Sequence, residues 1–498
     1  MALEFSASRL LGNVFGTSNI VWAVVIGLIL VYLSIGYWLG GRLADRRPEA
    51  RLLYSLIGLA GLFTAAVPLI SRPVLRVSAT AFDALDLPLL AGSFTAVVLL
   101  LTVPVVLLGT VVPFSLRLAL PDAAYAGRTS GLLSALSTAG SFIGTFLTVL
   151  VLIPALGTYR SFLLIAGLLL LLSSLGFTIL REKRFAAVAI IALLTTLILF
   201  TLGPRGQSKT TAGLIYEGES AYNYIQVVER DGYRYLRLNE GQGIHSIWHP
   251  QDLFYGGPWC QFLIAPLFNP DEQAASAVDQ IAILGLAAGT SARQAAMAYP
   301  QAKVMGVELD PEILRVGERY FGLGEIPQLE SVAGDARWEI TKNEAIYDLI
   351  IVDAYRPPYI PAHLVTVEFF ETLRQRLSSW GMVSINVGRS PNDYSLVDAL
   401  AATMGQVFPQ VFAVELPEAY NTILFAAVNP EASWANFEAN AKRVAAADPS
   451  SVLAQASELA LQARAAVNPG DLVFTDDQAP IEWMTNRLVL NFLFEEKP

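Results

Sequence analysis

The chain has 498 residues, only 15% of them charged, and its mean hydropathy of +0.49 excludes an ordinary soluble globular protein. Residues 1–203 hold 13 Lys and Arg against 7 Asp and Glu, a net charge of +6, whereas the remainder holds 20 against 36, a net charge of −16. The acidic remainder argues against nucleic acid as a partner, because phosphate binding needs clustered cations. The single Cys260 excludes an intramolecular disulfide, and no Cys/His cluster has the spacing of a metal site.

Residues 1–203 contain six apolar stretches, each near the roughly 20 residues that cross a bilayer. They predict a transmembrane domain of about six helices, with the lipid bilayer as its partner. Gly140 and Gly144 have the small-residue spacing of closely packed membrane helices. No stretch has an ionisable residue near its centre, which favours an anchor over an ion-coupled transporter. The stretches lie at 19–40, 52–70, 88–112, 131–153, 161–180 and 185–203.

The basic residues between these stretches predict an orientation in a bacterial inner membrane. The loops at 41–51, 113–130 and 181–184 carry nine Lys and Arg, whereas the opposite side carries four. Basic loops stay in the cytoplasm, so the 41–51 loop is expected inside. Six crossings then place the C-terminal part outside. A single miscounted span reverses this result, so the side of the soluble part stays open.

A small β-domain is expected after the membrane domain. Residues 204–212 are polar and read as a linker. Residues 222–229 and 233–239 alternate between apolar and polar side chains, with Asp231-Gly232 as a turn between them. We therefore predict an N-terminal β-hairpin domain over 213–250, followed by a helix over Trp259–Phe268.

Strands alternate with helices from Gln280 onward. This order predicts a Rossmann-like doubly wound parallel sheet within a domain over residues 251–490. The fold class is thus a multi-span α-helical membrane domain followed by an α/β part. Strands are expected at 281–285, 303–308, 329–333, 347–353 and 381–387, with helices between them ending near 298, 321, 343 and 378.

The predicted strand ends carry glycines and carboxylates. Gly285 and Gly289 follow the first strand, and Glu308 ends the second, 23 residues after Gly285. This spacing is close to the roughly 20 residues expected for a carboxylate that binds a ribose hydroxyl. Asp335 and Asp353 follow the next two strands. Each carboxylate alone fits a helix cap or a turn, but together they predict a nucleoside site at one edge of the sheet.

The order of these motifs resembles the spermidine synthase (polyamine aminopropyltransferase) family, specifically its membrane-fused bacterial branch. The likeness covers about residues 213–490, and residues 1–203 resemble the N-terminal half of that branch. Class I methyltransferases share the glycine turn and the ribose glutamate. The segments similar to family motifs are Ser220–Val227, Ile283–Thr290, Gly306–Asp310, Ala333–Ala336, Tyr347–Asp353 and Thr475–Pro480.

The resemblance implies the ligand and the residue roles. The donor would be an S-adenosylmethionine-derived nucleoside, in its decarboxylated form if an aminopropyl group is transferred. Gly285 and Gly289 would form the donor turn, Glu308 would bind the ribose, and Asp335 would lie near the adenine amino group. Asp353 would be the catalytic base. Family members commonly form dimers, so the resemblance also implies a homodimer.

The acceptor side departs from the family pattern. Tyr222, Asn223 and Tyr355 would line it, although Tyr355 equally fits packing. Ala288 stands where the family has an aspartate for the donor's amino group. Arg356 stands where the family has an aspartate for the substrate amine. A guanidinium repels a polyamine and suits a carboxylate, phosphate or sulfate.

Three functions therefore stay open. The first is transfer of an aminopropyl or related group, with Asp353 as the general base. The second is a repurposed extracytoplasmic enzyme acting on an anionic glycan or lipid, in which His245 or Tyr355 shares acid–base work with Asp353. His245 also fits a residue at the hairpin end without a chemical role. The third is a non-catalytic, membrane-anchored binding module.

Overall fold

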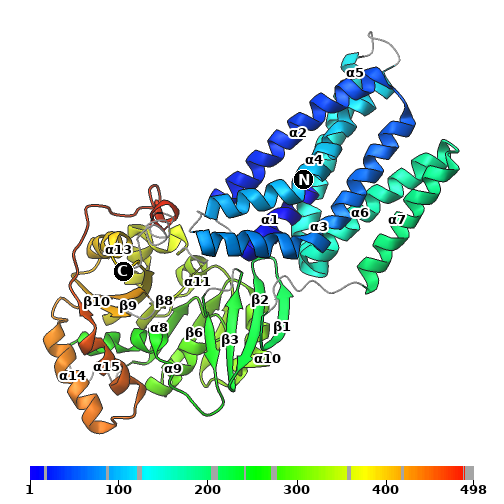
Figure 1. The fold of residues 1–498 in the computed structure, drawn as a ribbon. Coiled ribbons are helices and arrows are strands. Elements are labelled where there is room, and N and C mark those ends of the chain that lie inside the picture. Colours follow the sequence, from blue (N-terminus) through cyan, green and yellow to red (C-terminus); the bar gives the residue numbers. More distant parts are fainter. Residues whose placement is uncertain are drawn as a thin grey trace. The chain divides into compact units, whose positions relative to one another are not determined.

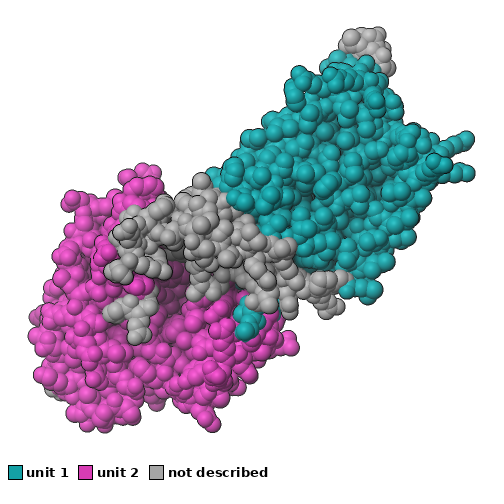
Figure 2. Space-filling model, viewed as in Figure 1, with its two compact units in different colours: residues 1–212, 217–224 teal, residues 213–216, 225–498 magenta. Residues whose placement is uncertain are grey.

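The computed structural model describes the whole chain except residues 16–18, 86–88, 121–125, 203–210, 240–242, 271–277, 356–359, 417–419, 486 and 488–498. The predicted linker 204–212 therefore lies almost entirely outside the described residues. The described chain forms two compact units (Figure 2). Unit 1 comprises Met1–Ala212 and Glu217–Tyr224, and unit 2 comprises Gly213–Tyr216 and Ile225–Pro498.

The described part of unit 1 before residue 203 is helical, as the apolar composition of residues 1–203 predicts. Among the described residues, five helical runs are long and apolar enough to cross a membrane. The run Ala126–Ile179 has 54 residues and contains two of the predicted stretches. The helices are α1 (Ala2–Phe15), α2 (Asn19–Arg46), α3 (Ala50–Leu85), α4 (Leu89–Ala119), α5 (Ala126–Leu147), the π-helix η2 (Thr148–Leu152), α6 (Ile153–Ile179) and α7 (Lys183–Leu202) (Figure 1).

The long run Ala126–Ile179 is broken after η2. Gly157 has φ +77° and ψ 166° inside α6. Only glycine adopts this conformation without a steric penalty from a Cβ atom. The break at Gly157 divides the run into two shorter helical segments. These two segments correspond to the predicted stretches 131–153 and 161–180.

Helix packing in unit 1 uses a glycine pair that sequence spacing alone did not single out. A Cβ atom on Gly36 of α2 would lie 2.8 Å from the Cα atom of Gly109 in α4, and one on Gly40 would lie 2.6 Å from the Cα atom of Thr110. The backbones of α2 and α4 therefore touch, as small residues permit in membrane helices. The predicted pair behaves differently: no described residue outside the helix comes within 4 Å of the Cβ position of Gly140, and the Cβ position of Gly144 lies beside Ala2.

The four-stranded antiparallel sheet confirms the predicted hairpin. Asp231 and Gly232 join β2 and β3 with φ angles of 52° and 84°. Two successive positive φ angles are typical of the type I′ turn that suits a two-residue hairpin. The sheet has the order β1 (Leu214–Glu219), β2 (Tyr224–Arg230), β3 (Tyr233–Leu238), β4 (Ser246–Trp248).

The eight-stranded sheet of unit 2 combines parallel and antiparallel pairs. Its order is β12-β10-β11-β9-β8-β5-β6-β7. The pairs from β9 to β7 are parallel, and those from β12 to β9 are antiparallel. The strands are β5 (Gln280–Leu284), β6 (Lys303–Glu308), β7 (Leu329–Ala333), β8 (Tyr347–Val352), β9 (Leu377–Gly388), β10 (Gln410–Leu416), β11 (Asn421–Ala427) and β12 (Arg464–Ala465).

Helices cover both faces of this sheet (Figure 1). Alternate residues of the strands point to opposite cores: Leu284 and Val352 enter one cluster, and Ile283 and Ile351 the other. The helices are α8 (Gly257–Gln261), η3 (Phe262–Phe268), α9 (Thr290–Ala298), α10 (Pro311–Phe321), η4 (Leu323–Glu325), α11 (Ala336–Lys342), η5 (Ala362–Leu364), α12 (Val367–Gln375), α13 (Ser395–Gly405), α14 (Trp434–Ala447) and α15 (Val452–Gln462).

The predicted order of strands and helices from residue 280 is confirmed, and the differences are local. The helix predicted to 378 ends at Gln375, and the following strand begins at Leu377 rather than 381. The antiparallel strands β10 to β12 are an addition to the predicted parallel sheet. Strand direction depends on which neighbour a strand pairs with, and alternating hydrophobicity does not encode that choice.

Candidate functional site

Five of the predicted site residues of unit 2 lie at one edge of the eight-stranded sheet: Gly285, Gly289, Glu308, Asp335 and Asp353. Strands β8, β5, β6 and β7 are parallel neighbours in that order. Parallel neighbours end at the same edge, so the segments after these four strands converge there. The site is therefore built from four consecutive strand ends, as the sequence predicts.

The turn after β5 requires its glycines. Gly285 has φ +101° and Gly289 has φ +93°. A Cβ atom on Gly285 would lie 2.6 Å from the carbonyl carbon and oxygen of Asp353. A Cβ atom on Gly289 would overlap the Leu323 side chain. The turn thus passes directly beside the end of β8, and Gly289 forms the N-cap of α9 with the helix N-terminus behind it.

Glu308 closes the turn from β6. Its Oε2 accepts a hydrogen bond from the Ala287 amide at 2.9 Å, and its Oε1 accepts one from the Asp310 amide at 3.0 Å. Burial raises the pKa of Glu308 to about 7, against the two backbone amides, which lower it. Each carboxylate oxygen keeps a further lone pair for a ligand hydroxyl. This arrangement fits the predicted ribose-binding role.

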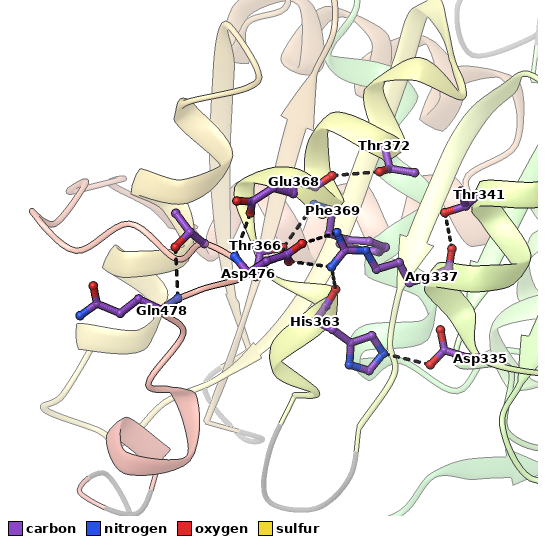
Figure 3. Close-up of polar contacts among 11 residues, drawn as sticks. Asp335, Arg337, Thr341, His363, Thr366, Glu368, Phe369, Thr372, Asp476 and Gln478 are labelled. Atoms are coloured by element: carbon purple, nitrogen blue, oxygen red, sulfur yellow. Dashed lines mark hydrogen bonds and ion pairs between the residues drawn. The ribbon is translucent and has the colours of Figure 1, made fainter.

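Asp335 caps α11 and contacts a histidine that the sequence analysis did not single out. Its Oδ1 accepts a hydrogen bond from the Trp338 amide at 3.0 Å. Its Oδ2 lies 3.0 Å from Nε2 of His363 in η5 (Figure 3). The cap explains part of why an aspartate stands here. The imidazole adds a contact from the segment that follows Asp353 in the chain.

A polar network joins this edge to the segment Thr475–Pro480. Arg337 of α11 donates to both Asp476 oxygens, at 2.7 and 2.8 Å, and its Nη1 also donates to the His363 carbonyl at 3.2 Å (Figure 3). Thr366 donates to Asp476 Oδ1 at 2.7 Å, and the Asp476 amide donates to Glu368 at 3.0 Å. The hydrogen bond from Arg337 holds the pKa of Asp476 below its usual range. The C-terminal segment therefore fixes α11 and η5 beside Asp335.

Asp353 follows β8 and lies between β5 and β9. Its amide donates to the Leu284 carbonyl at 2.9 Å. Its Oδ1 accepts a hydrogen bond from Asn386 Nδ2 at 3.1 Å. Burial raises the pKa of Asp353 to about 7, and the hydrogen bond from Asn386 opposes that rise. A carboxylate with such a pKa can take up a proton near neutral pH, which is what a general base must do.

Tyr355 lies beside Asp353, but its hydroxyl is engaged. It donates to the backbone carbonyl of Asn386 at 3.2 Å. Burial and the neighbouring Asp353 raise the pKa of Tyr355 far above its usual value. This geometry favours the packing role over acid–base work, and a catalytic role for Tyr355 stays a prediction.

His245 is neutral at physiological pH. Burial lowers its pKa to about 4, and its Nε2 has no hydrogen-bond partner among the described residues. The next residue, Ser246, accepts a hydrogen bond from the Ala288 amide at 2.9 Å, which places the start of β4 against the glycine turn. A neutral imidazole there suits hydrogen bonding to a ligand better than proton exchange at pH 7.

The remaining predicted residues lie elsewhere. Tyr222 and Asn223 belong to unit 1, in the segment Glu217–Tyr224. Within that unit Arg9 donates to the Tyr222 carbonyl at 3.0 Å. Their role toward an acceptor stays a prediction. Arg356 lies outside the described residues, and its role is likewise a prediction.

The residues that sequence reasoning missed share one property: each acts through a partner far away in the chain. Asn386 reaches Asp353 across 33 positions, and Arg337 reaches Asp476 across 139. Neither lies in a motif with a recognisable spacing. A polar side chain near the end of an otherwise apolar strand, as at Asn386 in β9, is the signal that could have identified the first.

Comparison of the sequence with known proteins identifies relatives of this chain. No family model matches the chain. A probable polyamine aminopropyl transferase of Bifidobacterium longum is 32% identical over 216 residues, which are 43% of this chain and 47% of that protein. The polyamine aminopropyltransferase of Vibrio vulnificus is 31% identical over 236 residues, which are 46% of this chain and 75% of that protein. The chain thus spans about half the length of the first relative and three quarters of the second.

The chain also resembles solved structures, at a sequence identity below that of the relatives above. A probable spermidine synthase from Corynebacterium glutamicum superposes with a TM-score of 0.39 and 22% identity, over 53% of this chain and 98% of that one. The α/β part with its ordered strand ends, and the 31% identity over three quarters of the Vibrio protein, identify the relationship. The chain belongs to the polyamine aminopropyltransferase (spermidine synthase) family, with several apolar helices N-terminal to the α/β part.

Proposed function

We propose that this protein is a membrane-anchored transferase that moves an aminopropyl or related group from an S-adenosylmethionine-derived donor to an amine. The observation that carries the proposal is the placement of Asp353. This carboxylate follows β8, lies against the Gly285 turn, and has a pKa raised to about 7 by burial. Family membership supplies the transferase class, and the geometry supports the role of the base.

The donor half of the site supports a nucleoside ligand. Gly285 and Gly289 leave the turn without side chains where Cβ atoms would collide with the surrounding chain. Glu308 presents a carboxylate held by two backbone amides at that turn. In nucleotide-binding α/β folds, a carboxylate at this position binds ribose hydroxyls. The residues present therefore fit a nucleoside donor.

The base half supports transfer to an amine. The acceptor nitrogen forms a bond to the carbon attached to the donor sulfonium. The carbon–sulfur bond breaks, and its electron pair stays on sulfur to give a neutral thioether. Asp353 takes the proton that the nitrogen loses and later releases it to solvent. The sulfonium supplies the leaving group, so the protein contributes orientation and a base.

Ala288 does not determine whether the donor is decarboxylated or intact S-adenosylmethionine. Its side chain is buried, and its amide donates to Ser246, so this position offers the donor no carboxylate. An ammonium group there would lack a charged partner, which disfavours it in a buried place. The test of function therefore uses both decarboxylated and intact S-adenosylmethionine as donors, with amines of different charge as acceptors.

The experiment for the proposed function uses the full-length protein in lipid nanodiscs. We expect methylthioadenosine to bind in calorimetry, and a donor–acceptor pair to release a nucleoside thioether. Asp353→Asn should lower turnover by roughly 10²–10⁴-fold, while the affinity for methylthioadenosine changes less than about twofold. Absence of binding at millimolar methylthioadenosine would remove the nucleoside transferase and leave two alternatives, the extracytoplasmic enzyme with an anionic substrate and the non-catalytic binding module. Binding with full activity in Asp353→Asn would remove Asp353 as the base.

The side of the membrane on which the soluble part lies separates the proposed function from its alternative. The basic loops support placing the soluble part outside the cytoplasmic membrane, where the alternative function, acid–base chemistry on an anionic glycan or lipid, would replace transfer to a cytosolic polyamine. Cys260 is buried, and burial raises its pKa to about 12, so an impermeant maleimide will report an added cysteine. We expect Ala446→Cys, exposed in α14, to react in intact cells, and Glu49→Cys to react after permeabilisation. The opposite labelling would support cytosolic transfer to a polyamine.

A further inference from the structure

Two asparagines form a chain of hydrogen bonds that ends on Asp353. Asn386 Nδ2 donates to Asp353 Oδ1 at 3.1 Å. Asn421 Nδ2 donates to Asn386 Oδ1 at 2.6 Å. The three residues come from three adjacent strands or strand ends, in the order β11, β9, β8. Asn386 is only 6% exposed, so water does not readily replace either hydrogen bond.

Strand register brings the three side chains together. Val352 pairs with Ile385 in the parallel β8–β9 ladder, so the next residues, Asp353 and Asn386, lie side by side. In the antiparallel β9–β11 ladder Asn386 pairs with Ile423. Asn421 is two residues from Ile423 and therefore lies on the same face of the sheet, diagonal to Asn386.

The chain of hydrogen bonds has a direction. An asparagine side chain has a donor end and an acceptor end. If the Asn386 amide were turned over, its oxygen would face the Asp353 carboxylate and its NH₂ would face the Asn421 NH₂. Both contacts would be repulsive. The carboxylate only accepts hydrogen bonds and therefore sets the Asn386 amide with its NH₂ toward Asp353, and Asn421 reinforces this orientation by donating to the Asn386 oxygen.

We propose that Asn386 and Asn421 are positioning residues for the base, holding Asp353 through Oδ1 and leaving Oδ2 to accept the proton from the acceptor amine. The proposal rests on the proposed function of Asp353. Oδ1 is occupied by the Asn386 donor. Within the described part of the chain, Oδ2 has no hydrogen-bond partner.

Asn386 also fixes the chain after Asp353. Its backbone carbonyl accepts the Tyr355 hydroxyl at 3.2 Å. The side chain and the backbone of one residue therefore hold Asp353 and Tyr355 at once. Among the residues that the structure describes, Tyr355 is the titratable neighbour of Asp353, while β5, β9 and β11 present the uncharged Gly285, Asn386 and Asn421.

The hydrogen bond acts on the charged form of Asp353. A donor to a carboxylate stabilises the ionised state and lowers its pKa, which opposes burial. Without Asn386, Asp353 would stay protonated to higher pH, and a smaller fraction of it would be ionised and able to act as a base at neutral pH. Without Asn421, the Asn386 oxygen would lose its donor, and the orientation that presents the NH₂ group to Asp353 would be held less strongly.

The experiment compares Asn386→Leu, Asn421→Leu and the double variant in the full-length protein. The titration of Asp353 is read by difference infrared spectroscopy of the carboxyl band, with Asp353→Asn as the subtracted reference. We expect Asn386→Leu to raise the midpoint by roughly one to two pH units, as loss of a hydrogen bond to a charged group predicts. Asn421→Leu should raise it by less. The double variant should match Asn386→Leu, because Asn421 acts only through Asn386.

Turnover and binding complete the test. The acid limb of the pH–rate profile should move with the infrared midpoint, while methylthioadenosine affinity stays within about twofold of wild type, which also shows that the variants fold. Asn386→Gln should restore part of the shift. The control Asn440→Leu changes an equally buried asparagine that bonds the Leu267 and Asn269 carbonyls, and it should leave the Asp353 midpoint unchanged.

Two results would overturn the proposal. One is an unchanged Asp353 midpoint in Asn386→Leu. The other is a double variant whose shift equals the sum of the two single shifts, since independent residues add. Because the infrared midpoint does not depend on turnover, a wild-type protein that is inactive with every donor would reject the proposed function, and the midpoints would still decide the role of the asparagines.

Discussion

The donor half and the base half of the site are built in different ways. The donor half consists of strand ends and the turns directly after them, so each residue is placed by its own strand. The base half joins Asp353 to Asn386 and Asn421 across three neighbouring strand segments. A local motif can therefore specify nucleoside binding, whereas the properties of the base depend on strand pairing. The donor half contains Gly285, Gly289, Glu308 and Asp335.

Gly285→Ala should have the largest effect, because Gly285 belongs to the contact between the two halves. Its Cβ atom would lie 2.6 Å from the Asp353 backbone, at a φ of +101°. A strained backbone of this kind costs about 1–3 kcal/mol, so we expect a fall in Tm of several degrees together with loss of both binding and turnover. Calorimetry and thermal unfolding measure the two effects.

The matched control is Gly324→Ala. Gly324 has nothing within 4 Å of its Cβ position and no positive φ. It should leave binding and Tm near wild-type values. If Gly285→Ala and Gly324→Ala have the same binding and the same Tm, the close approach between the turn and Asp353 is not required for binding or stability.

Glu308→Gln should weaken the donor half alone. Both Glu308 oxygens accept backbone hydrogen bonds, so an amide NH₂ would face either the Ala287 or the Asp310 donor. We expect methylthioadenosine affinity to fall at least about tenfold, as for a lost charged hydrogen bond. With a pKa of about 7, wild-type binding should strengthen as pH rises through 7. In Glu308→Gln, methylthioadenosine affinity should no longer change with pH, which calorimetry between pH 6 and 8 measures. A variant that keeps the pH dependence would show that Glu308 is not its source.

Asp353→Asn should separate function from stability in the base half. In the folded protein the pKa of Asp353 is about 7, above its ordinary value of 3.8. Between about pH 4 and pH 7 the folded state therefore keeps a proton on Asp353 that the unfolded state has lost. Ionisation of Asp353 therefore destabilises the fold as pH rises from about 4 to 7. We expect the inactive variant to have a higher Tm than wild type at pH 8, with the difference shrinking toward pH 5. A lower Tm at pH 8 would contradict burial of the charge.

Arg337→Lys should have the smallest effect. It removes the two-pronged hydrogen bond to Asp476, a residue whose side chain is 44% exposed. Exposed pairs contribute about 0–1 kcal/mol, so a small fall in Tm is expected at pH 7. The pKa of Asp476 is held low, so the stabilisation is present above pH 4 and is lost as pH falls below that value. Arg315→Lys is the control, because Arg315, which pairs with Glu312, is the more exposed of the two arginines, and an equal fall there would remove any special role for Asp476.

The donor half and most of the strand order were predictable because their signals are local. Glycines at positive φ, the Glu308 spacing and the Asp231-Gly232 turn each depend on a few consecutive residues. The apolar stretches of residues 1–203 are equally local, since a helix that crosses a bilayer is one continuous segment. Gly140 shows the limit of this reasoning, because spacing says nothing about which helix lies opposite.

The sequence by itself determined the alternation of strands and helices, the long apolar helices and the identity of the carboxylates at the strand ends. Only the tertiary structure decided that β9 lies beside β8, that β11 lies beside β9, and that two asparagines therefore reach Asp353. The physical reason is that strand pairing joins segments far apart in the chain. Burial of a carboxylate and the direction of its hydrogen bonds follow from that pairing rather than from any neighbouring residue.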